Sequence, residues 1–220
     1  MKEKLSTIYK MLILIISGIG LYLNFKLLDF DCIVYFTILS NIMVFMLYLF
    51  IVLKLFFKIN IDSNKYYLIK GFVTMAISIT MIVYTFLIAG TDALTSYIGH
   101  QNVGNFVHVY TPLLVIFDYI LFDEKHKVKK NYPFIWSLIL LFYFVFVKIY
   151  VLFGGLFEGG NTYPYEFMNV ERLGLMKTAL SYIVIYMTYV CVGLVIYYID
   201  NYGFRKGIQN GIKRISRKIK

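Results

Sequence analysis

The pattern best suited to chemistry lies in "YFTILSNIM", residues 35–43, inside a long apolar run. Thr37, Ser40 and Asn41 are spaced i, i+3 and i+4, so a helix places them on one face. A second polar group, His108, interrupts the apolar segment "FVHVYTPLL". A hydroxyl within hydrogen-bond reach of a neutral imidazole is a nucleophile with its general base. These residues offer a Thr37–His108 catalytic pair as one hypothesis, while helix packing is the more frequent role of such a threonine.

The composition indicates the elements that must carry these residues. The chain has 220 residues, of which 60% are hydrophobic, and its mean hydropathy is +0.72. Long uncharged runs of about 20 residues are typical of membrane spans, which must be helical because lipid offers backbone groups no partner. We therefore expect an all-α polytopic membrane protein built as a six-helix bundle. The six predicted spans are Tyr9–Phe25, Cys32–Phe57, Gly71–Gly90, Asn105–Phe122, Phe134–Phe153 and Met176–Ile199.

Basic residues alternate between the connections. They are frequent before the first span, in the second and fourth connections and in the tail, and sparse elsewhere. The positive-inside rule then predicts a protein of the cell membrane whose two termini both face the cytoplasm. The net charge of +10 is explained by this topology rather than by nucleic-acid binding. We expect one domain over residues 1–200 and a basic tail over 201–220, which either lies on the anionic inner leaflet or frays.

Several helices bring polar groups to one level near the outer side. Counted along the spans at about 1.5 Å per residue, Thr80, Tyr84 and Lys148 lie near the depth of Thr37 and His108. Ionisable groups inside spans usually face a cavity or a partner. This predicts a cavity open toward the outer side. His108 is alternatively a packed core or headgroup histidine, and Lys148 alternatively extends along its stem toward the interface.

Two further features concern the ends of the bundle. Asp118 lies near the cytoplasmic end of its span, where we expect it at the interface close to Lys125 or Lys127. On the other side, the connection "FGGLFEGGNTYPYEFMN", residues 153–169, has four glycines and an aromatic cluster. Such a cluster is poorly suited to water. We predict that the connection folds over the outer mouth of the cavity as a lid, the alternative being a plain exposed loop.

Several motifs occur in an order that resembles a known family. They are "FTILSN" at 36–41, "TMIVY" at 80–84, "HVYTPLLVIFDYILF" at 108–122, "YPFIW" at 132–136 and "TYPYEFMNV" at 162–170. Together they resemble the androgen-induced protein and androgen-dependent TFPI-regulating protein family, and above all its six-span bacterial members. The resemblance implies an intramembrane threonine hydrolase, with Thr37 as nucleophile and His108 as base. Its animal members cleave fatty acid esters of hydroxy fatty acids.

The predicted reaction is hydrolysis of a membrane lipid ester. Thr37 would attack the carbonyl and form an acyl-enzyme, which water activated by His108 then hydrolyses. The candidates for oxyanion stabilisation or substrate binding are Ser40, Asn41, Thr80, Tyr84, Lys148, Tyr163 and Glu166. Of these, Lys148 would bind a substrate carboxylate or instead pair with Glu158 or Glu166.

The alternative function is a transporter or lipid-binding protein that uses the same cavity without chemistry. A structural membrane subunit is also compatible with the sequence. A haem protein is disfavoured, because His108 is the only histidine within a predicted span. Metal-binding Cys/His spacing is absent from the sequence, so we expect no metal, no cofactor and no nucleic-acid partner.

Overall fold

The computed structural model describes residues 2–28, 30–88 and 103–203, which are helical throughout apart from their turns and connections. Five helices in these ranges are long and apolar enough to cross a membrane: Glu3–Leu28, Phe36–Phe57, Ser63–Phe86, Tyr132–Leu152 and Val170–Gly203. The predicted fourth span, Asn105–Phe122, corresponds to a shorter apolar helix, Phe106–Leu121. The expectation of a helical, multi-pass membrane protein is confirmed, with five full-length spanning candidates rather than six.

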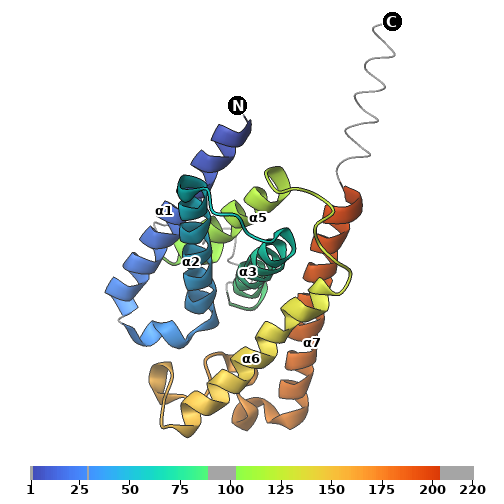
Figure 1. The fold of residues 1–220 in the computed structure, drawn as a ribbon. Helices are drawn as coiled ribbons and strands as arrows, with labels where there is room; N and C mark the ends of the chain where they lie inside the picture. Colours follow the sequence, from blue (N-terminus) through green and yellow to red (C-terminus); the bar gives the residue numbers. More distant parts are fainter. Residues whose placement is uncertain (1, 29, 89–102, 204–220) are drawn as a thin grey trace, which may run out of the picture.

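The helices follow one another with short connections (Figure 1). The long helices are α1 (Lys2–Leu28), α2 (Phe36–Phe57), α3 (Ser63–Val83), α5 (Thr111–Leu121), α6 (Tyr132–Leu152) and α7 (Val170–Tyr198). Three π-helical turns extend them, namely η2 (Tyr84–Ile88), η4 (Phe106–Tyr110) and η7 (Ile199–Gly203). Short 3₁₀ turns occupy the connections: η1 (Phe30–Val34), η5 (Glu158–Gly160) and η6 (Glu166–Met168).

Four helices, α1, α3, α6 and α7, begin before their predicted spans. The predicted third span starts at Gly71, whereas α3 starts at Ser63, where the carboxylate of Asp62 accepts the Lys65 backbone N–H at 2.9 Å. This N-cap satisfies one of the free amides at the helix start. Helix α7 starts six residues before the predicted Met176, but Gly174, at φ +76°, breaks it there. The end of the third predicted span and the tail from residue 204 lie outside the described residues.

Helix α3 occupies the centre of the bundle, between α2 on one side and α6 and α7 on the other (Figure 1). Its residues contribute to two hydrophobic clusters, one shared with α1, α2 and α5 and one shared with α6 and α7. The closest approach is at Gly71, where an added Cβ would lie 2.1 Å from the Trp136 ring. The Trp136 indole N–H donates to the Leu68 carbonyl at 2.9 Å. A small residue in α3 therefore admits the largest side chain of α6.

The polar connections lie at opposite ends of the bundle. The start of α1 and the end of α7 lie at one end, while η1 and the 153–169 connection lie at the other (Figure 1). Many large apolar side chains of the spanning helices are exposed, among them Phe142 at 68% and Leu152 at 82%. Such surfaces are expected where helices contact lipid rather than water.

A buried ionic network crosses the end of the bundle near the start of α1. Asp118 is fully buried, and its carboxylate lies 2.7 Å from Lys10 Nζ and 2.6 Å from Lys70 Nζ. Lys70 also contacts Asp123 at 2.5 Å, and the Tyr48 hydroxyl donates to Asp118 at 2.9 Å. Asp118 is thus paired with Lys10 and Lys70 rather than with the predicted Lys125 or Lys127. The difference arises because α3 starts early. Lys70, which we expected in the connection, therefore lies inside the helix, where it reaches Asp118.

A second buried carboxylate, Asp200, anchors the connection between α5 and α6. It accepts the backbone N–H groups of Lys127 at 2.8 Å and Val128 at 2.9 Å, and the Tyr119 hydroxyl at 3.3 Å. Its own carbonyl accepts the His126 backbone N–H at 3.2 Å. The end of α7 is thereby tied to the chain that leaves α5.

Candidate active-site pocket

Thr37 and His108 line one cavity of about 490 Å³, at the end of the bundle that carries η1 and the 153–169 connection. Its walls come from four parts of the chain: the end of α1, the η1–α2 junction, η4 and the connection before α7. The lining residues are Asn24, Leu28, Asp31, Cys32, Tyr35, Thr37, Ile38, His108, Leu156, Phe157, Glu158 and Tyr165. The structure thus brings together, from α2 and η4, the two residues that the sequence predicts to act as a pair.

Thr37 is the second residue of α2, and its side chain is half-buried. The helix begins here because Tyr35 is extended, at φ −81° and ψ 139°. The Phe36 backbone N–H donates to the Tyr143 hydroxyl at 3.2 Å, which satisfies a free amide of the first turn. Thr37 therefore sits at a fixed helix start, at the edge of the cavity.

His108 lies in the π-helical turn η4, a type of turn that is frequent at functional sites. Its Nδ1 lies 2.9 Å from the Gly104 carbonyl oxygen. A carbonyl only accepts, so Nδ1 carries the proton and Nε2 of the neutral ring keeps its lone pair. Within the described residues, Nε2 makes no hydrogen bond. The imidazole is thereby held as the tautomer that a general base requires.

Three of the predicted site residues connect helices instead of facing the cavity. Ser40 and Asn41 donate to the Thr37 carbonyl at 2.9 and 2.8 Å, not to its hydroxyl. Ser40 Oγ also lies 2.8 Å from Thr80 Oγ1, and Asn41 Nδ2 donates to the Val107 carbonyl at 3.0 Å. These fully or nearly fully buried groups fix α2 against α3 and η4. They hold the backbones on either side of the predicted pair, so their role is positional.

Tyr84 packs against the imidazole of His108. Its ring stacks on that of His108, with centroids 4.1 Å apart and planes inclined by 18°. Tyr84 belongs to η2, so a second π-helical turn faces the one that contains His108. The hydrogen bond to Gly104 and this stacking contact together fix the orientation of the His108 imidazole.

The remaining predicted residues lie elsewhere. Lys148 and Tyr163 line a separate cavity of about 150 Å³ under α7, with Glu171 and Tyr182. The Tyr163 hydroxyl accepts a hydrogen bond from Asn169 at 2.6 Å. Glu166 is exposed and pairs with Arg172 at 2.7 Å. The structure does not bring Lys148, Tyr163 or Glu166 to the cavity of Thr37 and His108.

Sequence reasoning missed Tyr165, which reaches the cavity from the 153–169 connection. Tyr165 and Thr37 both line this cavity, and together with Tyr143 they also line a small cavity of about 30 Å³. Burial raises the pKa of the Tyr165 phenol, so it remains a hydrogen-bond donor at neutral pH. The signal was the aromatic tract "YPYEF", but the sequence does not show which of its tyrosines turns inward.

The 153–169 connection covers the cavity, as a lid requires. It supplies Leu156, Phe157, Glu158 and Tyr165 to the lining. Phe157 is only 5% exposed, and the Glu158 backbone N–H donates to the Tyr35 hydroxyl at 3.0 Å. The Tyr35 ring meets Phe157 edge-on at 5.7 Å. Apolar and polar contacts therefore tie the connection to the residues just before Thr37.

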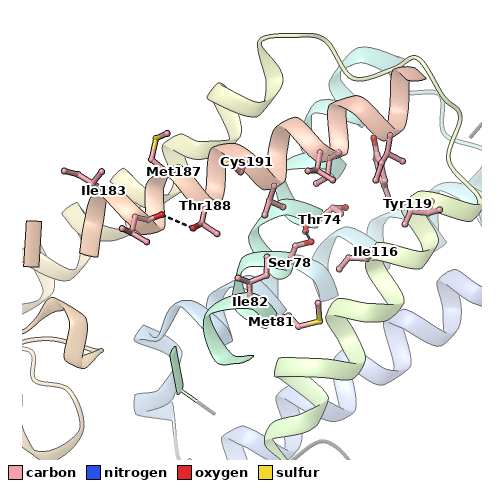
Figure 2. Close-up of a pocket in the computed structure, with 16 residues that line it drawn as sticks. Thr74, Ser78, Met81, Ile82, Ile116, Tyr119, Ile183, Met187, Thr188 and Cys191 are labelled. Atoms are coloured by element: carbon pink, nitrogen blue, oxygen red, sulfur yellow. Dashed lines mark hydrogen bonds between the residues drawn. The ribbon is translucent and has the colours of Figure 1, made fainter. Parts of the chain in front are cut away.

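A larger cavity, of about 640 Å³, lies away from this site, between α3, α5 and α7 (Figure 2). Its wall is apolar apart from a few hydroxyls, and two of these donate to their own helix: Ser78 to the Thr74 carbonyl at 2.6 Å and Thr188 to the Val184 carbonyl at 2.9 Å. No titratable base accompanies these hydroxyls among the described lining residues. This larger cavity, called the apolar groove below, suits a hydrocarbon chain. Of the two cavities, the smaller one combines a hydroxyl with an imidazole.

The fold is that of a helical, multi-pass membrane protein. No protein-family model matches the chain, and no characterised protein or solved structure matches it significantly. The resemblance to the androgen-induced protein family thus remains an expectation drawn from the sequence motifs.

Proposed function

We propose that this chain is an integral membrane hydrolase of lipid esters, with Thr37 as nucleophile and His108 as general base. The observation that supports the proposal is their convergence on one cavity, with His108 Nδ1 engaged by the Gly104 carbonyl and Nε2 left as acceptor. Thr37 Oγ1 and the imidazole are not hydrogen-bonded to each other in this structure. Such bonds are often loose without substrate and tighten in the complex.

In the proposed reaction, Thr37 Oγ1 attacks the ester carbonyl carbon while Nε2 of His108 takes the hydroxyl proton. The tetrahedral intermediate collapses, the C–O bond to the alcohol breaks, and His108 returns the proton to the leaving oxygen. Water then attacks the acyl-threonine in the same manner and releases the acid. The Tyr165 hydroxyl, which lines the same cavity as Thr37, supplies a hydrogen bond to the developing oxyanion.

We place this site in the outer half of a cell membrane. The lysine-rich second and fourth connections lie at the opposite end of the bundle, which the positive-inside rule assigns to the cytoplasm. An ester carbonyl lies just below the lipid headgroups, so a cavity at the outer end of the helices has access to it. Membrane lipids are then both the solvent and the source of substrate.

A fluorophosphonate probe of serine-type hydrolases tests the proposal. We expect the purified protein to be labelled, and both Thr37→Ala and His108→Ala to abolish labelling. Thr188→Ala is the matched control, because this threonine donates to its own helix and lies in the apolar groove. Undiminished labelling of a well-folded Thr37→Ala variant would overturn the assignment of the nucleophile.

The second candidate is a transporter or lipid-binding protein that uses the same cavity. The buried network of Lys10, Lys70, Asp118 and Asp123 lies at the opposite end of the bundle and favours the transporter, because ionisable groups inside membrane helices often mark proton or ion paths. Reconstituted vesicles separate the two candidates. Lipid movement or binding that persists in Thr37→Ala, without labelling of the parent protein, would support this function over hydrolysis.

A further inference from the structure

The charge of the cavity that holds Thr37 and His108 is distinctive. Two carboxylates, Asp31 and Glu158, belong to its lining, and none of the lining residues that the structure describes is a lysine or arginine. Neither carboxylate forms an ion pair within the described parts of the chain. Within the part of the chain that the structure describes, the lining therefore carries two negative charges and no lysine or arginine to balance them.

Lys148, the one cation that the sequence offered for a substrate carboxylate, does not change this balance. It is exposed and lines the separate cavity under α7. Arg172, on the same side of the bundle, is paired with Glu166 at 2.7 Å. Lys26 is exposed on α1 and is not part of the lining. Among the described lining residues, an anionic end group would thus meet two like charges and no lysine or arginine.

Aromatic rings accompany the two carboxylates. Tyr35, Phe157 and Tyr165 all line the cavity. The Tyr35 ring meets Phe157 edge-on at 5.7 Å and Tyr165 edge-on at 6.1 Å. Aromatic faces combined with carboxylates are the surroundings that bind ammonium groups, through cation–π attraction and Coulomb attraction together. Glu158 is held next to these rings, because its backbone N–H donates to the Tyr35 hydroxyl.

We infer that the ligand of this cavity is a lipid ester whose polar end carries an ammonium group and no phosphate. Asp31, Glu158 and the rings of Tyr35, Phe157 and Tyr165 receive the ammonium, and the ester lies toward Thr37. A phosphate is left out of the class because the described lining residues include no lysine or arginine to bind it. The ester part of this inference rests on the proposed function, whereas the ammonium part rests on the lining alone. It departs from the carboxylate-bearing substrates that the family resemblance implies.

Binding of non-hydrolysable ethers tests the ligand class directly. Four hexadecyl ethers, ending in trimethylammonium, glycerol, carboxylate and phosphocholine, are compared by displacement of a labelled ammonium ether in maltoside micelles. Protein-free micelles supply the blank. We expect the ammonium ether to bind at least tenfold more tightly than the other three, and its preference to shrink with added salt. Equal binding of the ammonium and glycerol ethers would overturn the inference.

Variants then assign the preference to residues. The double variant Asp31→Asn/Glu158→Gln should lose the preference for ammonium while it keeps its affinity for the glycerol ether. Glu171→Gln, an exposed outer carboxylate of the separate cavity, is the matched control and should behave like the parent. An unchanged preference in the double variant would contradict the inference.

The same panel separates this inference from the proposed function. Thr37→Ala should bind the ammonium ether as the parent does. If the parent binds it selectively but hydrolyses no ester, the hydrolase proposal fails and the ligand class stands. If instead the parent hydrolyses neutral, anionic and ammonium esters equally and binds the ethers without preference, the ligand class fails and the hydrolase proposal stands.

Discussion

The imidazole of His108 lies nearly parallel to the ring of Tyr84, with 4.1 Å between centroids and 18° between planes. The two residues belong to facing π-helical turns, η4 and η2. Since the Gly104 carbonyl holds Nδ1 from the helix side, the stack determines the remaining rotation of the ring. The direction of the Nε2 lone pair thus depends on a residue that is distant in sequence.

Removing the stacking ring should impair catalysis more than it impairs folding. We expect Tyr84→Leu to lower the rate of ester hydrolysis roughly tenfold or more, because small misplacements of a catalytic group are costly. Tyr84→Phe keeps the ring, so its rate of ester hydrolysis should fall less than that of Tyr84→Leu. The measurement is turnover of a lipid ester, with thermal unfolding as a control for stability. Equal losses in the two variants would argue against a positioning role of the ring.

Tyr165 and Tyr163 form a matched pair for testing the oxyanion donor. Tyr165→Phe should lower turnover by about 10²-fold, the usual effect of removing one such donor. Tyr163→Phe should have little effect on turnover, because this hydroxyl binds Asn169 in a separate cavity. Parallel kinetics of both variants and the parent supply the measurement. A larger loss in Tyr163→Phe would reverse the assignment.

The buried ionic network should be far more sensitive than a surface pair. Asp118→Asn leaves Lys10 and Lys70 without their shared carboxylate, so we expect a destabilisation of about 3–5 kcal/mol. Glu166→Gln breaks the exposed pair with Arg172 and should cost less than about 1 kcal/mol. Unfolding of both variants in the same detergent gives the comparison, and similar losses would contradict it.

Close packing at the centre of the bundle makes Gly71 intolerant of a side chain. Gly71→Ala places a methyl group 2.1 Å from the Trp136 ring, so the ring must move. We expect a loss of about 1–3 kcal/mol, typical of overpacking. Gly203→Ala, whose added carbon makes ordinary contacts of 3.5 Å or more, is the control. Thermal unfolding of the two variants tests the difference.

The start of α3 should depend on pH through Asp62. The Lys65 backbone N–H donates to this exposed carboxylate and lowers its pKa. Because the folded-state pKa lies below the unfolded-state value of about 3.9, the stabilisation is present above that value and is lost as the pH falls through the folded-state pKa. Asp62→Ala should therefore melt below the parent at pH 7, and the gap should narrow in acid. A gap independent of pH would exclude the cap.

The apolar runs predicted most of the fold. A single segment of this length can satisfy its backbone hydrogen bonds within lipid only as a helix. The start of α3 was predicted too late, because a lysine such as Lys70 is usually found outside a span. Its buried partners Asp118 and Asp123 are not apparent from the sequence. Charges that neutralise each other across helices are invisible to a hydropathy profile.

The candidate site was predicted unevenly for a related reason. Thr37 and His108 stand out because each is polar within an apolar helix. The i, i+3, i+4 stripe did place Ser40 and Asn41 near Thr37, but their hydrogen bonds go to its carbonyl and across to α3 and η4. Which tyrosine of the 153–169 connection enters the cavity depends on the path of this connection. No periodic pattern of apolar residues in the sequence predicts that path.

The anchoring of the α5–α6 connection by Asp200 has a consequence for the apolar groove of Figure 2. Helix α7 forms one wall of this groove, and near Ile199 it is fastened to the opposite wall through the backbone that follows Tyr119. Near Ile183 no comparable tether joins α7 to α3 or α5 within the described residues. In the described part of the chain, polar contacts therefore fasten this groove at its Ile199 end only, so a guest hydrocarbon tail would meet the less constrained wall near Ile183.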